Sequence, residues 1–86
     1  MPQLCRFYGI IIYLYFQDHN PPHFHAWYGG QKCEIGINDF EVLSGSLPQR
    51  ALALVLEWAS MHRDELRENW KLAQEGKELK QIEPLP

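Results

Sequence analysis

The sequence predicts a small α+β domain, in which an antiparallel meander of three to four strands packs on one long C-terminal helix. Residues 7–16 are dense in β-branched and aromatic side chains, which favour strands. Gly29-Gly30 is typical of a two-residue hairpin turn. From residue 51 onward, apolar residues recur at helical spacing. We therefore expect a single domain over residues 1–86, with the meander and a histidine-rich turn in 1–45, the helix in 46–76 and a tail in 77–86.

The composition is that of a folded domain rather than of a disordered or membrane-spanning chain. Apolar residues make up 45% of the 86 residues, which excludes an intrinsically disordered chain. The net charge of -3 gives no general electrostatic reason to bind nucleic acid or an anionic membrane. No apolar run approaches the roughly 20 residues that span a bilayer, and no signal peptide is evident. With only two cysteines, Cys5 and Cys33, we expect reduced thiols, a cytoplasmic location and no membrane partner.

The expected strands follow one another through short turns. The first strand, over residues 7–16, gives way to a loop over residues 17–22, because the two prolines of Asn20-Pro21-Pro22 have no N–H group to donate to a sheet. A second strand, over residues 22–28, leads into Gly29-Gly30. A third strand over 31–37, a turn at Asn38-Asp39 and a short fourth strand over 40–43 follow.

Counting residue pairs outward from Gly29-Gly30 assigns the side chains of this hairpin to two faces, since directly opposed residues share a face. One face is apolar and is expected to lie under the helix. It holds Phe24, Ala26, Cys33, Ile35 and Ile37, joined by Phe40 and Val42 across the next turn. The other face is polar and aromatic. It holds His23, His25, Trp27, Lys32 and Glu34, with His25 directly opposite Glu34.

The second half of the chain predicts one uninterrupted helix. Ser46-Leu47-Pro48-Gln49 has the form of a capping box, and Gly76 suits the C-terminal cap. A helix of roughly 28 residues is longer than the strands, so its far end, with Leu66 and Trp70, should overhang the sheet. Either the tail folds back over these residues, or another chain covers them, or the helix bends near His62.

The histidine-rich turn, Asp18-His19-Asn20-Pro21-Pro22-His23-Phe24-His25, is the candidate functional site. His23 and His25 lie on one side of a strand, at a spacing that suits two ligands of one metal ion such as zinc. A third ligand would come from His19, Asp18 or Glu34, and the primary metal set is His23, His25 and His19. The alternative is that these side chains only hydrogen-bond within the turn and hold its shape.

A reaction without a metal needs fewer ligands and is the second chemical interpretation of these residues. His19, His23, His25 and Glu34 form a candidate catalytic set, in which a histidine cation favoured by Glu34 is the acid and a neutral histidine is the base. Two histidines with a nearby cation are sufficient to cleave RNA through its 2′-hydroxyl, and Arg6 or Lys32 would supply that cation. No nucleophile elbow, phosphate-binding loop or C-x-x-C motif is present.

Aromatic residues on the same face form a candidate surface for a partner or ligand. Tyr13, Tyr15, Trp27 and Lys32 make up this surface. His62 lies on the apolar stripe of the helix, where a packed core histidine is the commoner interpretation. The row Arg63, Arg67 and Lys71 is the one candidate basic patch, although a solvated helix face explains it more simply.

The chain resembles the bacterial DUF4160 family over nearly its whole length. The residues that carry the resemblance are Arg6-Phe7-Tyr8-Gly9-Ile10, the histidine-rich turn, Tyr28-Gly29-Gly30, Gly45-Ser46-Leu47-Pro48 and the helix around Glu57-Trp58, while Cys5 replaces a usual polar residue. The family is one of unknown function. Its members are typically encoded beside a DUF2442 protein, in an arrangement that resembles a toxin–antitoxin pair.

Two functions remain open from the sequence. In the first, the protein is one component of a toxin–antitoxin-like pair, and its histidine-lined site binds or cleaves RNA. In the second, it is a non-enzymatic interaction module whose histidine-rich turn is structural, and whose aromatic face docks a protein. The resemblance implies a DUF2442-type partner, and self-association would meet the same need to cover apolar surface.

Overall fold

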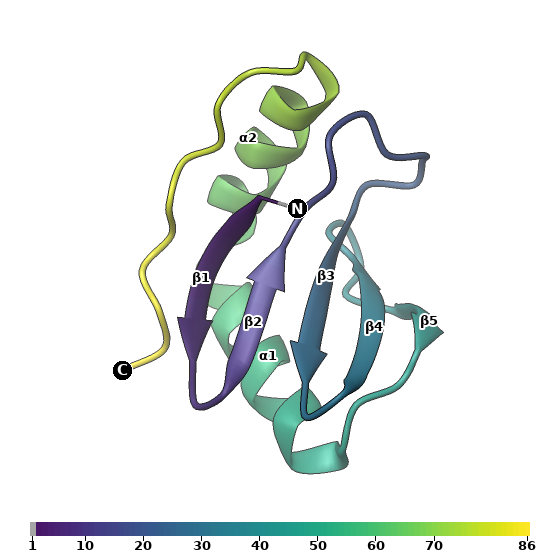
Figure 1. Ribbon diagram of the computed structural model, residues 1–86, viewed down its shortest axis with the longest axis vertical. Helices are drawn as coiled ribbons and strands as arrows, with labels where there is room; N and C mark the ends of the chain where they lie inside the picture. The colour runs from purple at the N-terminus through teal and green to yellow at the C-terminus, as the bar shows by residue number, and fades with distance from the viewer. Residues whose placement is uncertain (1) are drawn as a thin grey trace.

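The computed structural model describes residues 2–86 and contains one five-stranded antiparallel sheet and two helices (Figure 1). The strands are connected as a meander in the order β1-β2-β3-β4-β5, and both helices lie on one face of the sheet. The predicted α+β class is confirmed, whereas the prediction of three to four strands and one long helix is wrong in detail. The elements are β1 (Gln3–Phe7), β2 (Ile10–Tyr13), β3 (His23–Tyr28), β4 (Gln31–Gly36), β5 (Val42–Gly45), α1 (Gln49–Met61) and α2 (Arg63–Gln74).

The first hairpin corrects the prediction of a single strand over residues 7–16. Phe7 pairs with Ile10, so Tyr8 and Gly9 form a two-residue turn. Both turn residues have positive φ, 49° at Tyr8 and 80° at Gly9, as the tight hairpin turns require. Tyrosine seldom adopts this conformation, so Gly9 was the only residue of the apolar segment that marked the turn.

The central hairpin has the register expected from Gly29-Gly30. Phe24 pairs with Ile35, and His25 pairs with Glu34. The expected core face of these strands is confirmed, because Phe24, Ala26, Cys33, Ile35 and Ile37 are all buried. The same register pairs Trp27 with Lys32, so the polar and aromatic residues share the opposite face, as expected.

The connection from β4 to β5 differs from the expected turn at Asn38-Asp39. Phe40 has a φ of 58° and lies outside the sheet, with the Arg63 guanidinium 4.3 Å from its ring centre. The last strand therefore spans 42–45 rather than 40–43. Val42 pairs with Ile35 as expected, but it is 42% exposed and so is not part of the buried core.

Two helices replace the predicted single one. The chain leaves helical geometry at His62, where φ is -131° and ψ is 27°, so that the bend considered at this residue is present. The predicted capping box is absent: Pro48 is the N-cap, and no side chain caps α1. Gly76 follows α2 with a φ of 68° and donates its N–H to the carbonyl of Ala73, as a C-terminal cap residue does.

The C-terminal tail folds back from the end of α2 and runs alongside β1 (Figure 1). Ile82 donates its N–H to the carbonyl of Leu4, and the Trp58 indole N–H donates to the carbonyl of Glu83 at 2.8 Å. Ile82 is buried, as is Leu85. Because the tail and the break at His62 keep α2 close to the sheet, Leu66 and Trp70 are buried and do not overhang it.

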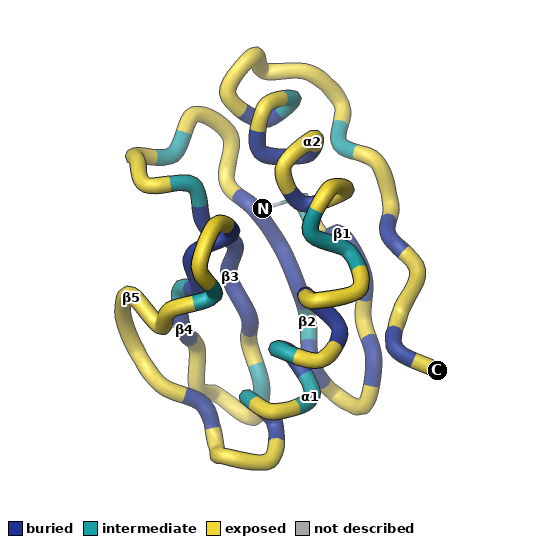
Figure 2. The backbone as a smooth tube through the Cα atoms, turned by 180° about the vertical axis from the view of Figure 1, so that it is seen from behind, coloured by how far each residue is buried: buried dark blue, intermediate teal, exposed yellow. Residues whose placement is uncertain are grey.

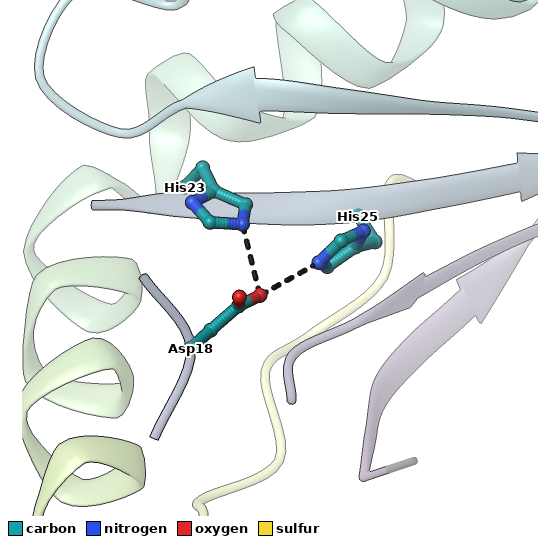
Figure 3. Close-up of side chains that lie close together, drawn as sticks. All are labelled: Asp18, His23 and His25. Carbon is teal, nitrogen blue, oxygen red and sulfur yellow. Dashed lines mark hydrogen bonds and ion pairs between the residues drawn. The ribbon is translucent and has the colours of Figure 1, made fainter. Parts of the chain in front are cut away.

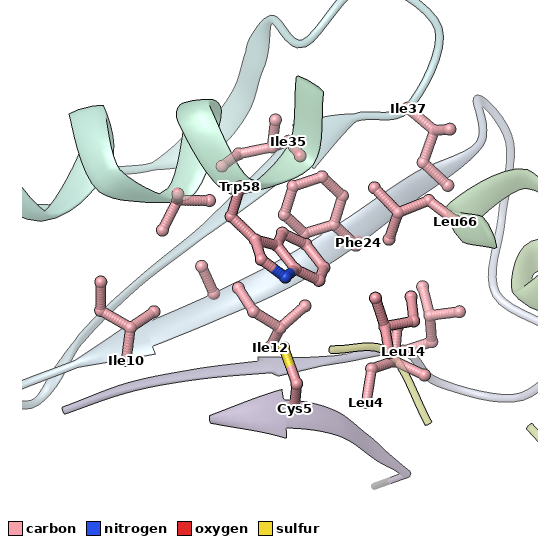
Figure 4. Close-up of a cluster of buried hydrophobic side chains, with 14 of the residues drawn as sticks. Leu4, Cys5, Ile10, Ile12, Leu14, Phe24, Ile35, Ile37, Trp58 and Leu66 are labelled. Carbon is pink, nitrogen blue, oxygen red and sulfur yellow. The ribbon is translucent and has the colours of Figure 1, made fainter. Parts of the chain in front are cut away.

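The core lies between the sheet and the helices, and Trp58 is at its centre (Figure 4). The Trp58 ring packs 5.7 Å from Phe7 and 6.0 Å from Phe24, measured between ring centres. Figure 2 shows buried residues concentrated on the strands and on the inner sides of the helices. Within residues 2–86, no helix is long and apolar enough to cross a membrane.

Candidate functional site

The loop between β2 and β3 is held in place by the end of α2. Gln17 donates its N–H to the carbonyl of Ala73 at 3.1 Å, and the Gln74 side-chain amide donates to the carbonyl of Asp18 at 3.0 Å. The Asn20–Pro21 peptide bond is cis. The two hydrogen bonds hold the loop at its middle, where the carboxylate of Asp18 points toward β3 (Figure 3).

Asp18 is the centre of the site. Its Oδ2 lies 2.9 Å from Nε2 of His23 and 3.1 Å from Nε2 of His25 (Figure 3). Its Oδ1 accepts the backbone N–H of His19 at 2.8 Å and lies 2.9 Å from Nδ1 of the same residue. One carboxylate thus contacts all three histidines that the sequence placed in the site.

His23 is fully buried, and both of its ring nitrogens face oxygen atoms. Nδ1 lies 2.7 Å from the carbonyl of Pro21, which can only accept, so this nitrogen carries a proton. Nε2 faces the Asp18 carboxylate and lies 3.5 Å from Oε1 of Glu34. A neutral ring would therefore aim its lone pair at two carboxylates. Either a second proton or a cation must occupy the space beside Nε2.

The site contains two groups of metal-ligating side chains whose donor atoms lie within 4.8 Å of one another. The first is Asp18, His23 and His25, and the second is His19, His23 and Glu34. The structure thus divides the three predicted histidine ligands between two groups that share His23. In the first group every side chain is at least largely buried, whereas the His19 side chain is 74% exposed.

Aromatic rings pack around the histidines. Tyr13 stacks on His25 with ring centres 5.0 Å apart and planes 10° apart, and Tyr15 meets the same imidazole edge-on at 4.7 Å. On the other side, Trp70 of α2 lies 5.3 Å from the ring of His23. These rings pack against the imidazoles and restrict their movement.

Burial and hydrogen bonding shift the titration of the site. Burial lowers the pKa of His25 below its ordinary value, and the hydrogen bond to Asp18 opposes this shift without reversing it. Burial acts on Asp18 in the opposite sense, but hydrogen bonds with His25 and the backbone N–H of His19 prevail and hold the pKa of this carboxyl below its ordinary value. Asp18 is thus an anion near neutral pH, and His25 favours its neutral form, which is the form that ligates metals.

The cysteines lie outside the site's chemistry. Cys5 and Cys33 are free and buried. Burial raises the pKa of Cys5 to about 12 and that of Cys33 to about 11. Neither side chain is a ready nucleophile, because the thiolate is the reactive form.

Two cavities lie on the sheet face beside the site. The smaller, of about 230 Å³, is bounded by His25 and Glu34 of the site and by Ser44 and Gly45 of β5. The larger, of about 450 Å³, is bounded by Ile11, Trp27 and Gly30. The two cavities share three further lining residues, Tyr13, Tyr15 and Lys32. All four residues of the predicted partner or ligand surface therefore line these cavities.

Exposure differs among those four residues. The Tyr15 side chain is 41% exposed and that of Trp27 39%, whereas Tyr13 is only 2% exposed. Burial, together with the neighbouring Tyr15, raises the pKa of Tyr13 to about 12.

His62 is separate from the site, since its Nδ1 pairs with Glu65 and its ring packs on Trp58.

Sequence reasoning missed two features of the site. It offered Asp18 only as one of three third ligands, although this carboxylate joins the whole cluster. It also placed Trp70 on an overhang rather than against His23. The position of Asp18 directly before His19 and the diproline was the available signal for its role. No local signal existed for the contact between Trp70 and His23.

Comparison with known proteins agrees with the resemblance seen in the sequence. The profile of the family "Domain of unknown function (DUF4160)" matches residues 9–71, which include β2 to β5 and the entire histidine-rich turn. No curated protein and no solved structure is matched by the chain. Because the profile covers most of the chain, the protein belongs to the DUF4160 family.

Proposed function

We propose that the protein is a metal-dependent hydrolase that binds a divalent ion of the zinc class through Asp18, His23 and His25. Two imidazoles and one carboxylate are a common ligand set for catalytic zinc and for iron(II). Three protein ligands leave a coordination position for water, as catalytic centres require. The proposal assigns the ion to the space that the Nε2 atoms of both histidines and Oδ2 of Asp18 surround.

The surroundings of His23 carry this proposal. Its Nδ1 proton is committed to the carbonyl of Pro21, an arrangement typical of metal-ligating histidines, whose second nitrogen is then free to bind the ion. Its Nε2 faces the carboxylates of Asp18 and Glu34 in a fully buried position. Two carboxylates beside neutral imidazoles leave two negative charges, which a divalent cation balances. Uncompensated, these charges would be costly to bury.

The residues around the ligands suit hydrolysis of a phosphodiester. A zinc-class ion would lower the pKa of its bound water to near 7. Glu34 is not part of the group Asp18, His23 and His25 but borders the small cavity, and we assign it the water proton. With an ion bound, the deprotonated water would attack phosphorus as the bond from phosphorus to the leaving oxygen breaks. His19 is the exposed histidine, and we assign it the proton that the leaving oxygen takes up.

The proposal also names a substrate and a partner protein. We assign RNA as the substrate, and we assign the protein to a toxin–antitoxin-like pair with a DUF2442-type partner. The burial of His23 argues against the metal-free version, in which histidines act directly on the RNA, because a fully buried ring has no access to a substrate. His23 is therefore better suited to hold an ion than to exchange protons with RNA.

The test is a metal titration of protein produced without a histidine tag and stripped with a chelator. Calorimetry with Zn²⁺ should give about one site per chain. Co²⁺ should give the intense visible absorption of a four-coordinate ion. His23→Gln and Asp18→Asn should each weaken binding by at least about tenfold, because loss of a residue that only supports a metal ligand already costs about this much. His62→Gln is the matched control, because this histidine pairs with Glu65 outside the site.

Activity gives a second measurement on the same samples. The zinc-loaded protein should hydrolyse bis(p-nitrophenyl) phosphate, and Glu34→Gln should reduce turnover while leaving zinc binding nearly unchanged. Absence of zinc binding would contradict the proposal at its base. Zinc binding without hydrolysis would reduce the proposal to a structural metal site.

The interaction module is the second candidate function, and the exposure of β5 favours it. Val42 and Leu43 of this edge strand are 42% and 40% exposed, so an apolar sheet edge is open to another chain. In this version His23 carries a second proton, and Asp18 only fixes the loop. A stripped protein that binds no metal but forms a stable complex through this edge would favour the module.

A further inference from the structure

We infer that the sheet face beside the metal centre binds single-stranded RNA, with one base on Trp27 and the backbone phosphates on Lys32 and Arg6. This inference rests on the proposed hydrolase, since it gives that centre its substrate. It begins from the strand registers. Arg6 pairs with Ile11, Ile11 with Trp27, and Trp27 with Lys32, so these four residues form one row across the sheet.

The row places an exposed indole between two cations. Directly opposed residues share a face, so Arg6 and Lys32 lie on the same face as Trp27. Their backbones are three strand spacings apart, or roughly 14 Å. Both side chains are exposed, and neither makes an ion pair with any residue from 2 to 86. The local positive charge is thus available to a ligand even though the whole chain is acidic.

The next row on the same face of the sheet leads into the proposed metal centre. Tyr13 pairs with His25, and His25 pairs with Glu34. The large cavity lies over the Trp27 row, the small one lies against His25 and Glu34, and Lys32 lines both. A phosphate bound at Lys32 would therefore stand between an aromatic surface and the residue that we assign as the base.

The chemistry of the two cavities distinguishes the parts of a nucleotide. The large cavity is bounded by the flat side chains of Trp27 and Tyr15, on which an unpaired base can stack. The small cavity offers the hydroxyls of Tyr15 and Ser44 beside Lys32, which suit the phosphate and the ribose. A duplex keeps its bases stacked on one another, so a single strand is the form that can use both cavities.

The test measures binding of a dye-labelled oligouridylate of about eight nucleotides by fluorescence anisotropy, on stripped protein at low salt. Trp27→Ala should weaken binding about 5- to 150-fold, which corresponds to the usual range for one stacked base. Lys32→Gln and Arg6→Gln should each reduce the slope of log K against log salt by about 0.7. Trp27→Phe retains a stacking ring and should weaken binding less, which guards against a folding defect in the alanine variant.

Matched controls lie on the helices, away from this face. Lys71→Gln removes one exposed cation from α2, and Met61→Ala removes one exposed apolar side chain from the end of α1. Neither control should change the affinity. If Lys71→Gln weakened oligouridylate binding and Lys32→Gln did not, the RNA would bind on the helix surface and the inference would be overturned.

Competitors define the part of the strand that is recognised. An abasic strand of equal length should compete at least about fivefold more weakly, because it lacks the stacked base. Equal competition by the abasic strand, or by free uridine monophosphate, would overturn the inference. A DNA strand of equal length, oligodeoxythymidylate, should also bind less well than the oligouridylate. Tighter binding of this DNA strand would contradict RNA as the ligand.

The outcomes separate the two proposals. Protein that binds zinc and hydrolyses the small diester but does not bind the oligouridylate would refute this inference and the assignment of RNA as the substrate, while the metal-dependent hydrolase would stand. Protein that binds the oligouridylate with the expected loss at Trp27 but takes up no zinc would refute the proposed hydrolase alone.

Discussion

Asp18→Asn is the substitution that tests most deeply how the site is built. The change keeps the shape of the side chain but removes its charge and one acceptor oxygen. In the native protein Oδ2 faces two imidazoles at 2.9 and 3.1 Å, and Oδ1 accepts the N–H of His19. One of the imidazoles, that of His23, is fully buried.

The expected magnitude follows from these contacts. Hydrogen bonds that involve a charged group contribute about 1.5–3 kcal/mol each. The two imidazole contacts share one oxygen and the asparagine carbonyl can retain one contact, so the losses do not add. We expect the free energy of unfolding of the metal-free protein to fall by about 2–4 kcal/mol. For a domain of this size, such a loss lowers the melting temperature by about 10–25 °C.

Urea and thermal unfolding, both in the presence of a chelator, measure this effect. Asp39→Asn is the control, since Asp39 accepts one backbone N–H, from Glu41, in an exposed turn. It should cost less than about 1 kcal/mol. If Asp18→Asn changed the free energy of unfolding by no more than the control does, Asp18 would not be the centre of the site, and the reasoning would be refuted.

Three further predictions concern pH, the tail and the sheet. Because the pKa of His25 is lower in the folded than in the unfolded protein, the unfolded chain binds more protons below about pH 6.5, and stability should fall as the pH drops through this window toward the folded pKa. The urea midpoint of chelator-treated protein should thus be higher at about pH 7.5 than at about pH 5.5, with a smaller difference in His25→Gln; an unchanged difference would remove His25 as its source. Ile82→Ala should cost about 2–5 kcal/mol, because this tail residue is buried, whereas Glu78→Ala should cost almost nothing; equal, small losses in urea unfolding would show that the tail does not pack as described. Gly45→Ala should destabilise the protein by more than about 1 kcal/mol, since the new Cβ would lie 2.2 Å from a carbonyl oxygen of β4 and φ is 74°; an unchanged melting temperature would contradict this close approach.

The central hairpin could be predicted because local chemistry determines it. Two adjacent glycines fix the position of the turn, and alternation along the strands then fixes every pair. From these pairs alone, His25 could be placed opposite Glu34 and on the same face as His23. The location of the candidate site therefore followed from a short stretch of sequence.

The remaining parts depend on contacts between distant residues or on rare conformations. The first turn uses a tyrosine at positive φ, and the single glycine beside it is a weak signal within an apolar segment. The break at His62 occurs without proline or glycine, so helical periodicity could not position it with certainty. The orientation of Asp18 depends on Gln74, which is 56 residues away along the chain. Only the folded structure brings this carboxylate onto the two imidazoles.

The metal complement of the untagged protein tests the central claim most directly. Elemental analysis of the purified chain, followed by X-ray absorption of the zinc-loaded form, reports both the amount of metal and its ligands. We predict about one zinc per chain, with nitrogen and oxygen ligands at about 2.0–2.1 Å that include two imidazoles, and loss of the metal in His23→Gln. Less than about a tenth of an equivalent after zinc loading, or a ligand shell without two imidazoles, would contradict the account.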